Sequence, residues 1–171
     1  RVHPVITKGG EVVNVIPDEV CLESYVRGKS MEAILETNTM VDRALKGGAV
    51  ALGAKVEIED FAGYYPLYQD KNLNSLAQKI MEELVAQEAI FITEAGDHGT
   101  GSTDMGDLSS LMPVIHPNVG GIEGTGHSKN FKMTDPEVSY IIGSKFLACT
   151  VVELLYNQAA EAKKIINDYE P

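Results

Sequence analysis

The residue best suited to chemistry in this chain is His127, which lies in the run Gly-Gly-Ile-Glu-Gly-Thr-Gly-His-Ser at residues 120–128. An imidazole binds metals and exchanges protons near neutral pH, and flexible glycine backbone lets a metal or substrate approach the main chain closely. A catalytic zinc ion needs about three protein ligands, and no paired His or Cys motif surrounds His127. Any co-ligands must therefore come from distant residues or from residues outside this chain.

Composition excludes several classes of function. The 171 residues are 44% hydrophobic, which is enough for one domain or two small ones. A net charge of -11 argues against nucleic-acid and anionic membrane partners, both of which attract patches of Lys and Arg. Two cysteines are too few for a disulfide framework, so we expect a cytoplasmic protein. Residues 141–156 are strongly apolar, but Lys145 and Glu153 interrupt them, which favours a buried helix over a membrane span.

The first 64 residues predict a β-β-α-β unit. Residues 19–27 read as a half-buried strand, and we expect it to form an antiparallel pair with a strand over residues 2–7. Ser30 is expected to cap a helix that ends at Gly53, and residues 55–58 alternate in polarity like a further strand. This order is that of a ferredoxin-like α+β unit without its first strand and helix. Because residue 1 is Arg and a strand is already under way, we expect the chain to be a fragment of a longer protein.

Residues 65–171 predict strands alternating with helices. The apolar spacing indicates a helix over 73–84, short strands over 89–93 and 113–115, and a long C-terminal helix that Asp135 caps. Such alternation implies an α/β layer with its loops gathered at one edge of a sheet. The predicted fold class is therefore α/β (α+β), with a boundary near residue 64.

Three motifs occur in a characteristic order along the chain. Asn-Val-Ile-Pro-Asp at 14–18 precedes a strand that leads into Arg27, Gly-Ser-Thr-Asp-Met-Gly-Asp follows at 101–107, and Gly-His-Ser at 126–128 precedes the long helix. Together they resemble the zinc aminoacylase and carboxypeptidase G superfamily of metallopeptidases. The match is best to the amidohydrolase branch that contains aminobenzoyl-glutamate hydrolase, and it covers essentially the whole chain.

The resemblance implies a role for each part of the chain. Residues 1–64 match the later part of a lid that forms a homodimer, and residues 65–171 match the C-terminal portion of the catalytic α/β domain. His127 matches a ligand of one of two divalent metal ions, zinc or manganese. The positions that match substrate-binding residues are Asn14, Arg27, Gly124 and Gly126.

The resemblance also implies an activity, namely metal-dependent hydrolysis of an N-acyl, aminobenzoyl or dipeptide amide bond of a small amino-acid conjugate. The general base and the remaining metal ligands of this superfamily lie in an N-terminal part that the chain lacks. No catalytic residue is therefore assigned here, and we expect the isolated chain to be inactive and to bind no metal tightly. The alternative function is a non-catalytic dimerisation or ligand-binding module on the same scaffold.

Each candidate also has a purely structural interpretation. His127 alone fits a surface turn, and Arg27 alone fits a solvated charge on the face of a strand. Asn14 is equally suited to capping the turn that follows it. His3 lies on the first strand within reach of a substrate, although a packed or solvent-facing role is favoured for it.

Overall fold

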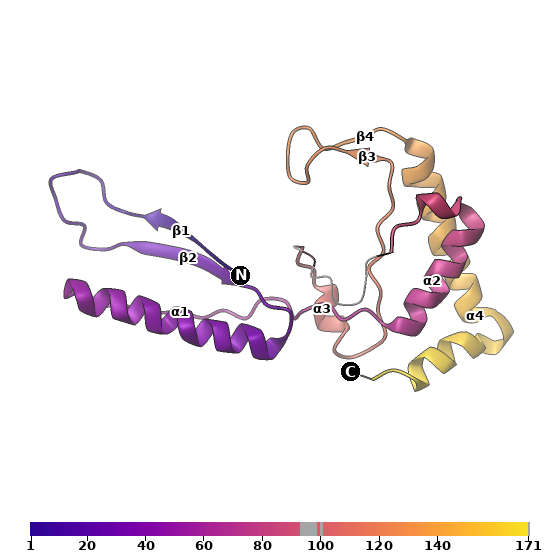
Figure 1. Ribbon diagram of the computed structural model, residues 1–171, viewed down its shortest axis with the longest axis horizontal. Helices are drawn as coiled ribbons and strands as arrows, with labels where there is room; N and C mark the ends of the chain where they lie inside the picture. The colour runs from indigo at the N-terminus through magenta and orange to yellow at the C-terminus, as the bar shows by residue number, and fades with distance from the viewer. Residues whose placement is uncertain (93–98, 100, 171) are drawn as a thin grey trace. The chain divides into compact units, whose positions relative to one another are not determined.

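The computed structural model describes residues 1–92, 99 and 101–170, and the chain divides into two compact units, Arg1–Pro66 and Leu67–Pro171 (Figure 1). Unit 1 contains β1 (Val2–Lys8), β2 (Cys21–Val26) and α1 (Met31–Leu52). Unit 2 contains α2 (Lys71–Leu84), the 3₁₀ turn η1 (Gln87–Ala89), α3 (Met105–Leu108), β3 (Ile122–Glu123), β4 (Lys132–Met133), the π-helix η2 (Glu137–Ile142) and α4 (Gly143–Asn167). Helices combined with small antiparallel sheets make this an α+β chain. That the units are a lid and the end of a catalytic domain stays a prediction.

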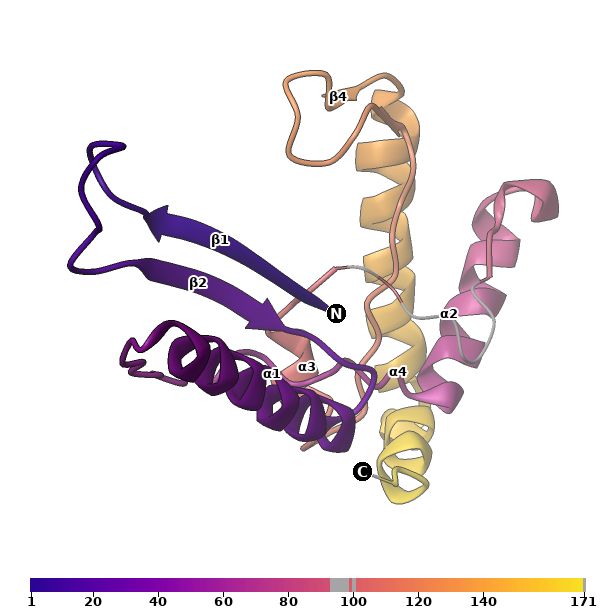
Figure 2. The same cartoon turned by 60° about the vertical axis from the view of Figure 1, so that its left-hand side comes forward.

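The antiparallel pair predicted for the start of the chain is confirmed as the β1–β2 hairpin (Figure 2). Its register runs from Val2 opposite Val26 to Ile6 opposite Leu22, with an irregularity before Lys8. Most side chains on both strands are exposed, so the expectation of a half-buried strand over residues 19–27 is wrong. The reason is that the sheet has only two strands and contacts α1 mainly through β2.

An ion pair at the loop end of this hairpin links Lys8, the last residue of β1, to Glu19 in the loop. The Lys8 ammonium donates a hydrogen bond to the Glu19 carboxylate. This hydrogen bond and the attraction between the charges raise the pKa of Lys8 and lower the pKa of Glu19. Both groups are thus held in their charged forms. Because both side chains are exposed, the pair adds little to stability and mainly fixes the base of the loop.

The first helix begins and ends at the predicted residues. Ser30 caps α1 from an extended conformation, and its hydroxyl accepts a hydrogen bond from Ala33 N at 3.2 Å. Gly53 ends the helix in the left-handed region at φ 66°, where glycine has no Cβ penalty. No residue of the helix is fully buried, and its partly buried apolar residues are Met31, Ala33, Ile34, Val41, Leu45 and Ala49.

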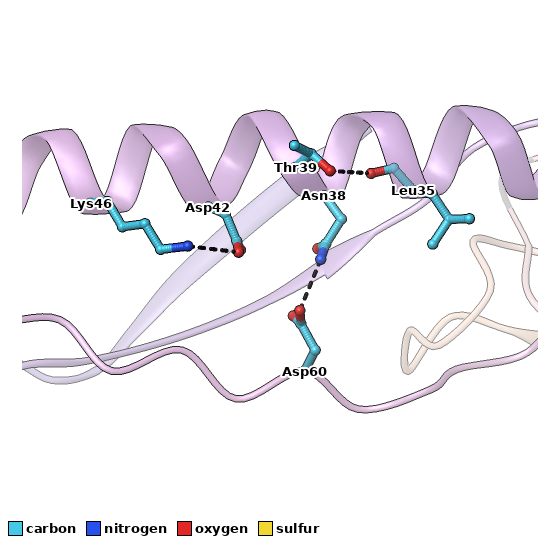
Figure 3. Close-up of polar contacts among 6 residues, drawn as sticks. All are labelled: Leu35, Asn38, Thr39, Asp42, Lys46 and Asp60. Atoms are coloured by element: carbon cyan, nitrogen blue, oxygen red, sulfur yellow. Dashed lines mark hydrogen bonds and ion pairs between the residues drawn. The ribbon is translucent and has the colours of Figure 1, made fainter.

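The strand predicted over residues 55–58 is wrong. Residues 54–70 form neither helix nor strand, and unit 1 is therefore β-β-α. A strand needs a neighbour for its ladder, and the β1–β2 sheet includes no third strand among the described residues. The segment is instead tied to α1, because Asn38 Nδ2 donates to Asp60 Oδ2 at 3.0 Å (Figure 3).

The core of unit 2 lies between α2 and α4, which run side by side in both views (Figures 1 and 2). The helix predicted over 73–84 is confirmed, with Asp70 as its cap: Leu73 N donates to Asp70 Oδ1 at 2.7 Å. Five side chains make up the buried cluster: Leu76, Ala77, Ile80, Phe146 and Ile165.

The described residues of unit 2 do not form the predicted α/β layer. No strand covers residues 89–92, and Thr93, the end of that predicted strand, lies outside the described residues. Residues 113–115 are also without a ladder, although Val114 is buried. The carbonyl of Val114 accepts a hydrogen bond from Asp70 N at 2.8 Å, so it anchors the start of α2 rather than a neighbouring strand. Strand pairing in the described part of unit 2 is limited to β3 and β4.

The predicted cap of the C-terminal helix is confirmed. Asp135 Oδ1 accepts hydrogen bonds from the backbone of Glu137 and Val138 at 3.1 Å each. The first six residues then wind as a π-helix before α4 begins. The expectation that residues 141–156 are buried is wrong, because Phe146 is the one buried residue there.

By length and composition alone, the helical segment Glu137–Asn167 could cross a membrane, and 11% of its most apolar stretch is buried in this structure. The core helix of a soluble protein can pass the same test of length and composition. The backbone of α4 leaves helical geometry at residues 156–159. Such a break frees backbone polar groups that lipid does not satisfy, which argues against a continuous span.

We expect Phe146→Ala to lower the free energy of unfolding by about 3–5 kcal/mol, the usual cost of emptying a buried phenylalanine site. Phe146 is 2% exposed and touches the α2 side of the core. The adjacent Leu147 is 64% exposed, so Leu147→Ala is the matched control and should change stability by less than about 1 kcal/mol. Urea unfolding followed by circular dichroism measures both. Equal losses in the two variants would contradict the core assigned here.

Candidate functional site

The loop that carries His127 is the tip of a small antiparallel hairpin. Ile122 pairs with Met133 and Glu123 with Lys132, and residues 124–131 connect the two short strands. The second strand of the hairpin, β4, leads within four residues into the C-terminal helical segment, as the orange stretch before α4 in Figure 1 shows. Its position is therefore set by the beginning of that helix.

Hydrogen bonds lock the base of the hairpin to the helix start. The carbonyl of Gly121 accepts from Thr134 N at 2.9 Å and from Asp135 N at 3.0 Å. The hydroxyl of Ser139, on the first helical turn, donates to the carbonyl of Gly120 at 2.9 Å. Asp135, the residue that caps the helix, thus also holds the base of the hairpin through its backbone N–H.

His127 occupies a backbone conformation that an L-residue rarely adopts. Its φ is 63°, within a tight turn that Ser128 N closes onto Thr125 O at 3.1 Å. A left-handed conformation costs a non-glycine residue about 1–2 kcal/mol, and such residues cluster at functional sites. The positive φ falls on His127 although Gly126 stands beside it. The imidazole is exposed at the tip of the hairpin.

Two of the glycines before His127 are required by the backbone itself. A Cβ on Gly121 would lie 2.4 Å from Asp135 O, and one on Gly124 would lie 2.1 Å from Asn130 O. Both glycines also have left-handed φ values, 83° and 95°. Gly126 differs, since nothing lies within 4 Å of a Cβ built there. Gly124 therefore has a structural reason to be glycine, whereas Gly126 leaves open space beside His127.

The described residues of this chain do not form a metal site by themselves. They contain no group of three or more His, Cys, Asp or Glu side chains placed to hold one ion. A structural or catalytic metal needs three or four such ligands. His127 offers one imidazole. His116, the nearest described histidine along the chain, is exposed, and its backbone N–H bonds to Gln69 Oε1 at 2.9 Å.

The structure brings His3 and Arg27 onto one face of the β1–β2 hairpin, with a tyrosine between them. His3 lies directly opposite Tyr25 in the ladder. The Arg27 guanidinium lies 5.4 Å from the centre of the Tyr25 ring, in the range of a cation–π contact. The alternation of the strand puts Tyr25 and Arg27 on one face, but the sequence does not give the register that adds His3. Tyr25 was therefore not among the predicted site residues.

Asn14 is not brought to that face. It lies in the loop between β1 and β2, in a turn where Val15 N approaches Val12 O at 3.5 Å. The loop joins the strands at their Lys8 and Cys21 ends, whereas His3 and Arg27 lie at the other end of the ladder. The side chain of Asn14 is exposed. The structure thus separates two of the residues predicted to meet one substrate.

Comparison with known proteins supports the resemblance at low identity. The chain is 27% identical over 169 residues to the Xaa-Arg dipeptidase of Mus musculus, which covers 93% of this chain and 38% of the relative. It is 30% identical over 122 residues to the Xaa-Arg dipeptidase of Homo sapiens, covering 68% and 27%. It is also 30% identical over 105 residues to the N-acetyldiaminopimelate deacetylase of Pediococcus pentosaceus, covering 61% and 26%.

All three names denote enzymes that hydrolyse an amide bond, in agreement with a zinc amidohydrolase and peptidase superfamily. No protein-family model matches the chain. The chain spans less than two fifths of the length of each of these relatives.

We expect Gly124→Ala to destabilise the β3–β4 hairpin by about 1–3 kcal/mol, because alanine is strained at positive φ and its Cβ would collide with Asn130 O. Gly126→Ala is the matched control and should be tolerated. Amide hydrogen exchange at Phe131, whose N–H bonds to Ser128 O at 3.1 Å, reports on the loop. If both variants exchange like the parent chain, the close approach at Gly124 is not formed in solution.

Proposed function

We propose that this chain is part of a metal-dependent amidohydrolase or peptidase that cleaves the amide bond of a dipeptide or an N-acyl amino acid. The observation that carries the proposal is His127, an exposed imidazole held at a strained φ of 63° on a hairpin that is bonded to a helix start. The names of the three relatives support the class of reaction. Their substrates differ from one another, which leaves the acyl group of this protein unspecified.

In this proposal His127 is one ligand of a divalent ion, zinc or manganese. A metal in such an enzyme polarises the scissile carbonyl and supplies an activated water. The remaining ligands and the general base come from outside the 171 residues. The part played by this chain is positional, because the hydrogen bonds of Gly121 and Ser139 fix the hairpin on which His127 stands.

The face formed by His3, Tyr25 and Arg27 suits the carboxylate of an amino-acid product. A guanidinium presents a planar fork of donors that matches a carboxylate. The Tyr25 ring beside it restrains that fork, and His3 adds a second nitrogen donor across the ladder. Asn14 is a separate substrate contact in this proposal, because its exposed amide lies in the hairpin loop at the other end of the ladder from this face. Gly126, with open space at its α-carbon, provides room for the substrate next to His127.

We also propose that unit 1 forms the homodimer contact, in a cytoplasmic protein. The two-stranded sheet leaves the outer edges of β1 and β2 without a ladder partner among the described residues. An exposed strand edge pairs readily with another strand, and two identical edges related by a two-fold axis make a closed contact.

We expect His127→Gly, in the longer protein to which this chain belongs, to remove about one metal ion per protomer and to abolish turnover. Glycine is preferred to alanine here because it accepts the φ of 63° and so preserves the turn. His116→Gly, at an exposed loop position, is the control and should retain metal and activity. Metal analysis and an amidase assay decide the matter. Full metal content and full rate in His127→Gly would leave His127 as a turn residue only.

Arg27→Ala in the same protein should raise KM by about tenfold or more while sparing metal content, because the lost interaction binds substrate. Arg43→Ala is the matched control, since Arg43 is an exposed arginine on the α1 helix of the same unit. Steady-state kinetics on a dipeptide with a free carboxylate measures the effect. Unchanged kinetics in Arg27→Ala would remove this residue from the substrate site and leave the role of His127 standing.

A non-catalytic module is the second candidate, favoured by the observation that the described residues hold no three-ligand cluster. The two functions differ in what the complete reading frame encodes. About two hundred further residues with His, Asp and Glu ligands fit the enzyme, in line with the size of a two-domain chain. A reading frame limited to these 171 residues, together with weak zinc binding by calorimetry, fits the module.

A further inference from the structure

The C-terminal helix changes direction at residues 156–159 through a run of left-handed backbone. Tyr156 has a ψ of 153°, and Asn157, Gln158 and Ala159 have φ values of 49°, 58° and 59°. Helical geometry resumes afterwards and continues to Asn167. We call residues 160–170 the C-terminal arm. In Figure 1 the yellow end of α4 turns away from the upper part of the helix at this point.

Local sequence does not favour this bend. The stretch from 156 to 159 contains neither glycine nor proline, and its Gln and Ala are strong helix formers. Each left-handed non-glycine residue is strained relative to a right-handed helix, because its Cβ lies too close to the following carbonyl oxygen. A straight helix through these residues would avoid that strain. The bend must therefore be maintained by contacts that the arm makes elsewhere.

Two contacts of the arm offset the strain. Ile165 is 2% exposed and belongs to the buried cluster that α2 forms with Phe146. Tyr169, near the end of the arm, donates its hydroxyl hydrogen to the carbonyl of Ser109 at 2.7 Å. A straight α4 would carry both groups away from these positions, because the arm would then extend along the axis of the first part of the helix.

Ser109 connects the arm to the α3 segment. Its own side chain is buried, donates to Gly106 O at 2.7 Å and accepts from Tyr68 N at 3.1 Å. Ser109 thus joins the start of unit 2, the α3 turn and the arm. The α3 turn includes the end of the Gly-Ser-Thr-Asp-Met-Gly-Asp motif at residues 101–107.

We propose that the C-terminal arm is a latch that holds the α3 segment, and that α4 is a two-state element. In the latched state the left-handed bend docks Ile165 and Tyr169. In the released state residues 156–159 become right-handed helix, α4 straightens, and Ser109 loses its bond from Tyr169. Strain at the bend and burial of the arm oppose each other, so small changes in either shift the balance.

Replacing Gln158 by glycine tests the bend. Glycine should slow amide exchange in the arm if the helix is bent at this residue, and should speed it if the helix is straight. At φ 58° glycine relieves strain, so Gln158→Gly should slow amide exchange at Asp168 and Tyr169 by about fivefold or more. The control is Gln78→Gly, at an exposed position in the right-handed α2, which should speed exchange in α2 by about fivefold. Faster exchange of the arm in Gln158→Gly would show a straight helix and overturn the proposal.

Removing the Tyr169 hydroxyl tests the latch. In the 171-residue chain, Tyr169→Phe should speed amide exchange at Ser109, Leu111 and Met112, whose N–H groups bond within the α3 segment. Tyr140→Phe, an exposed tyrosine at the other end of the helical segment, is the control and should leave these amides unchanged. If Tyr169→Phe frees the arm alone and leaves the α3 amides as they are, the arm is docked but does not latch α3.

Discussion

The packing of α4 against α2 is the contact on which the rest of unit 2 depends. Phe146 and Ile165 insert beside Leu76 and Ile80, and the described residues of this unit bury little else. This small core fixes the direction of α4. The direction of α4 in turn sets its first turns, and hydrogen bonds from those turns hold the hairpin with His127. The arm with Ile165 returns to the same core only through a strained bend. The position of the His127 imidazole and the strain in α4 therefore both depend on the apolar contact between α2 and α4.

Backbone conformation, more than side-chain contact, defines the candidate site. Gly121 and Gly124 are glycine because a Cβ would collide with the main chain of the returning strand. His127 takes a left-handed φ that its neighbour Gly126 would adopt at lower cost. A sequence under selection for stability alone would place glycine at that position. The cost of keeping an imidazole there argues that the side chain is needed, and its exposure means that the core does not need it.

Local signals in the sequence predicted the ends of helices well, but the strands over 55–58 and in unit 2 poorly. Ser30, Gly53 and Asp135 act within one turn of their helices, so their effect is readable from neighbouring residues. A strand depends on a partner that is distant in sequence. Residues 55–58 and 113–115 have the polarity of strands but no ladder partner among the described residues. Val114 bonds to the start of α2 instead, and Asp60, just after 55–58, bonds to Asn38 on α1. The same limit applies to the site. His127 was found by its glycines, whereas the pairing of His3 with Tyr25 required the register of the ladder.

Exposed apolar side chains are common to both units, and they bear on what stabilises the chain. Ile6 on β1 is 64% exposed, and Leu147 and Leu155 on α4 are each 64% exposed. Fully burying such a side chain contributes about 1.5–3 kcal/mol of stability. These exposed side chains do not make that contribution in the structure described. The net charge of -11 opposes indiscriminate association of these faces between copies. Covering these faces therefore requires a surface of matching shape, because burial of apolar area stabilises an association only where the two surfaces pack closely.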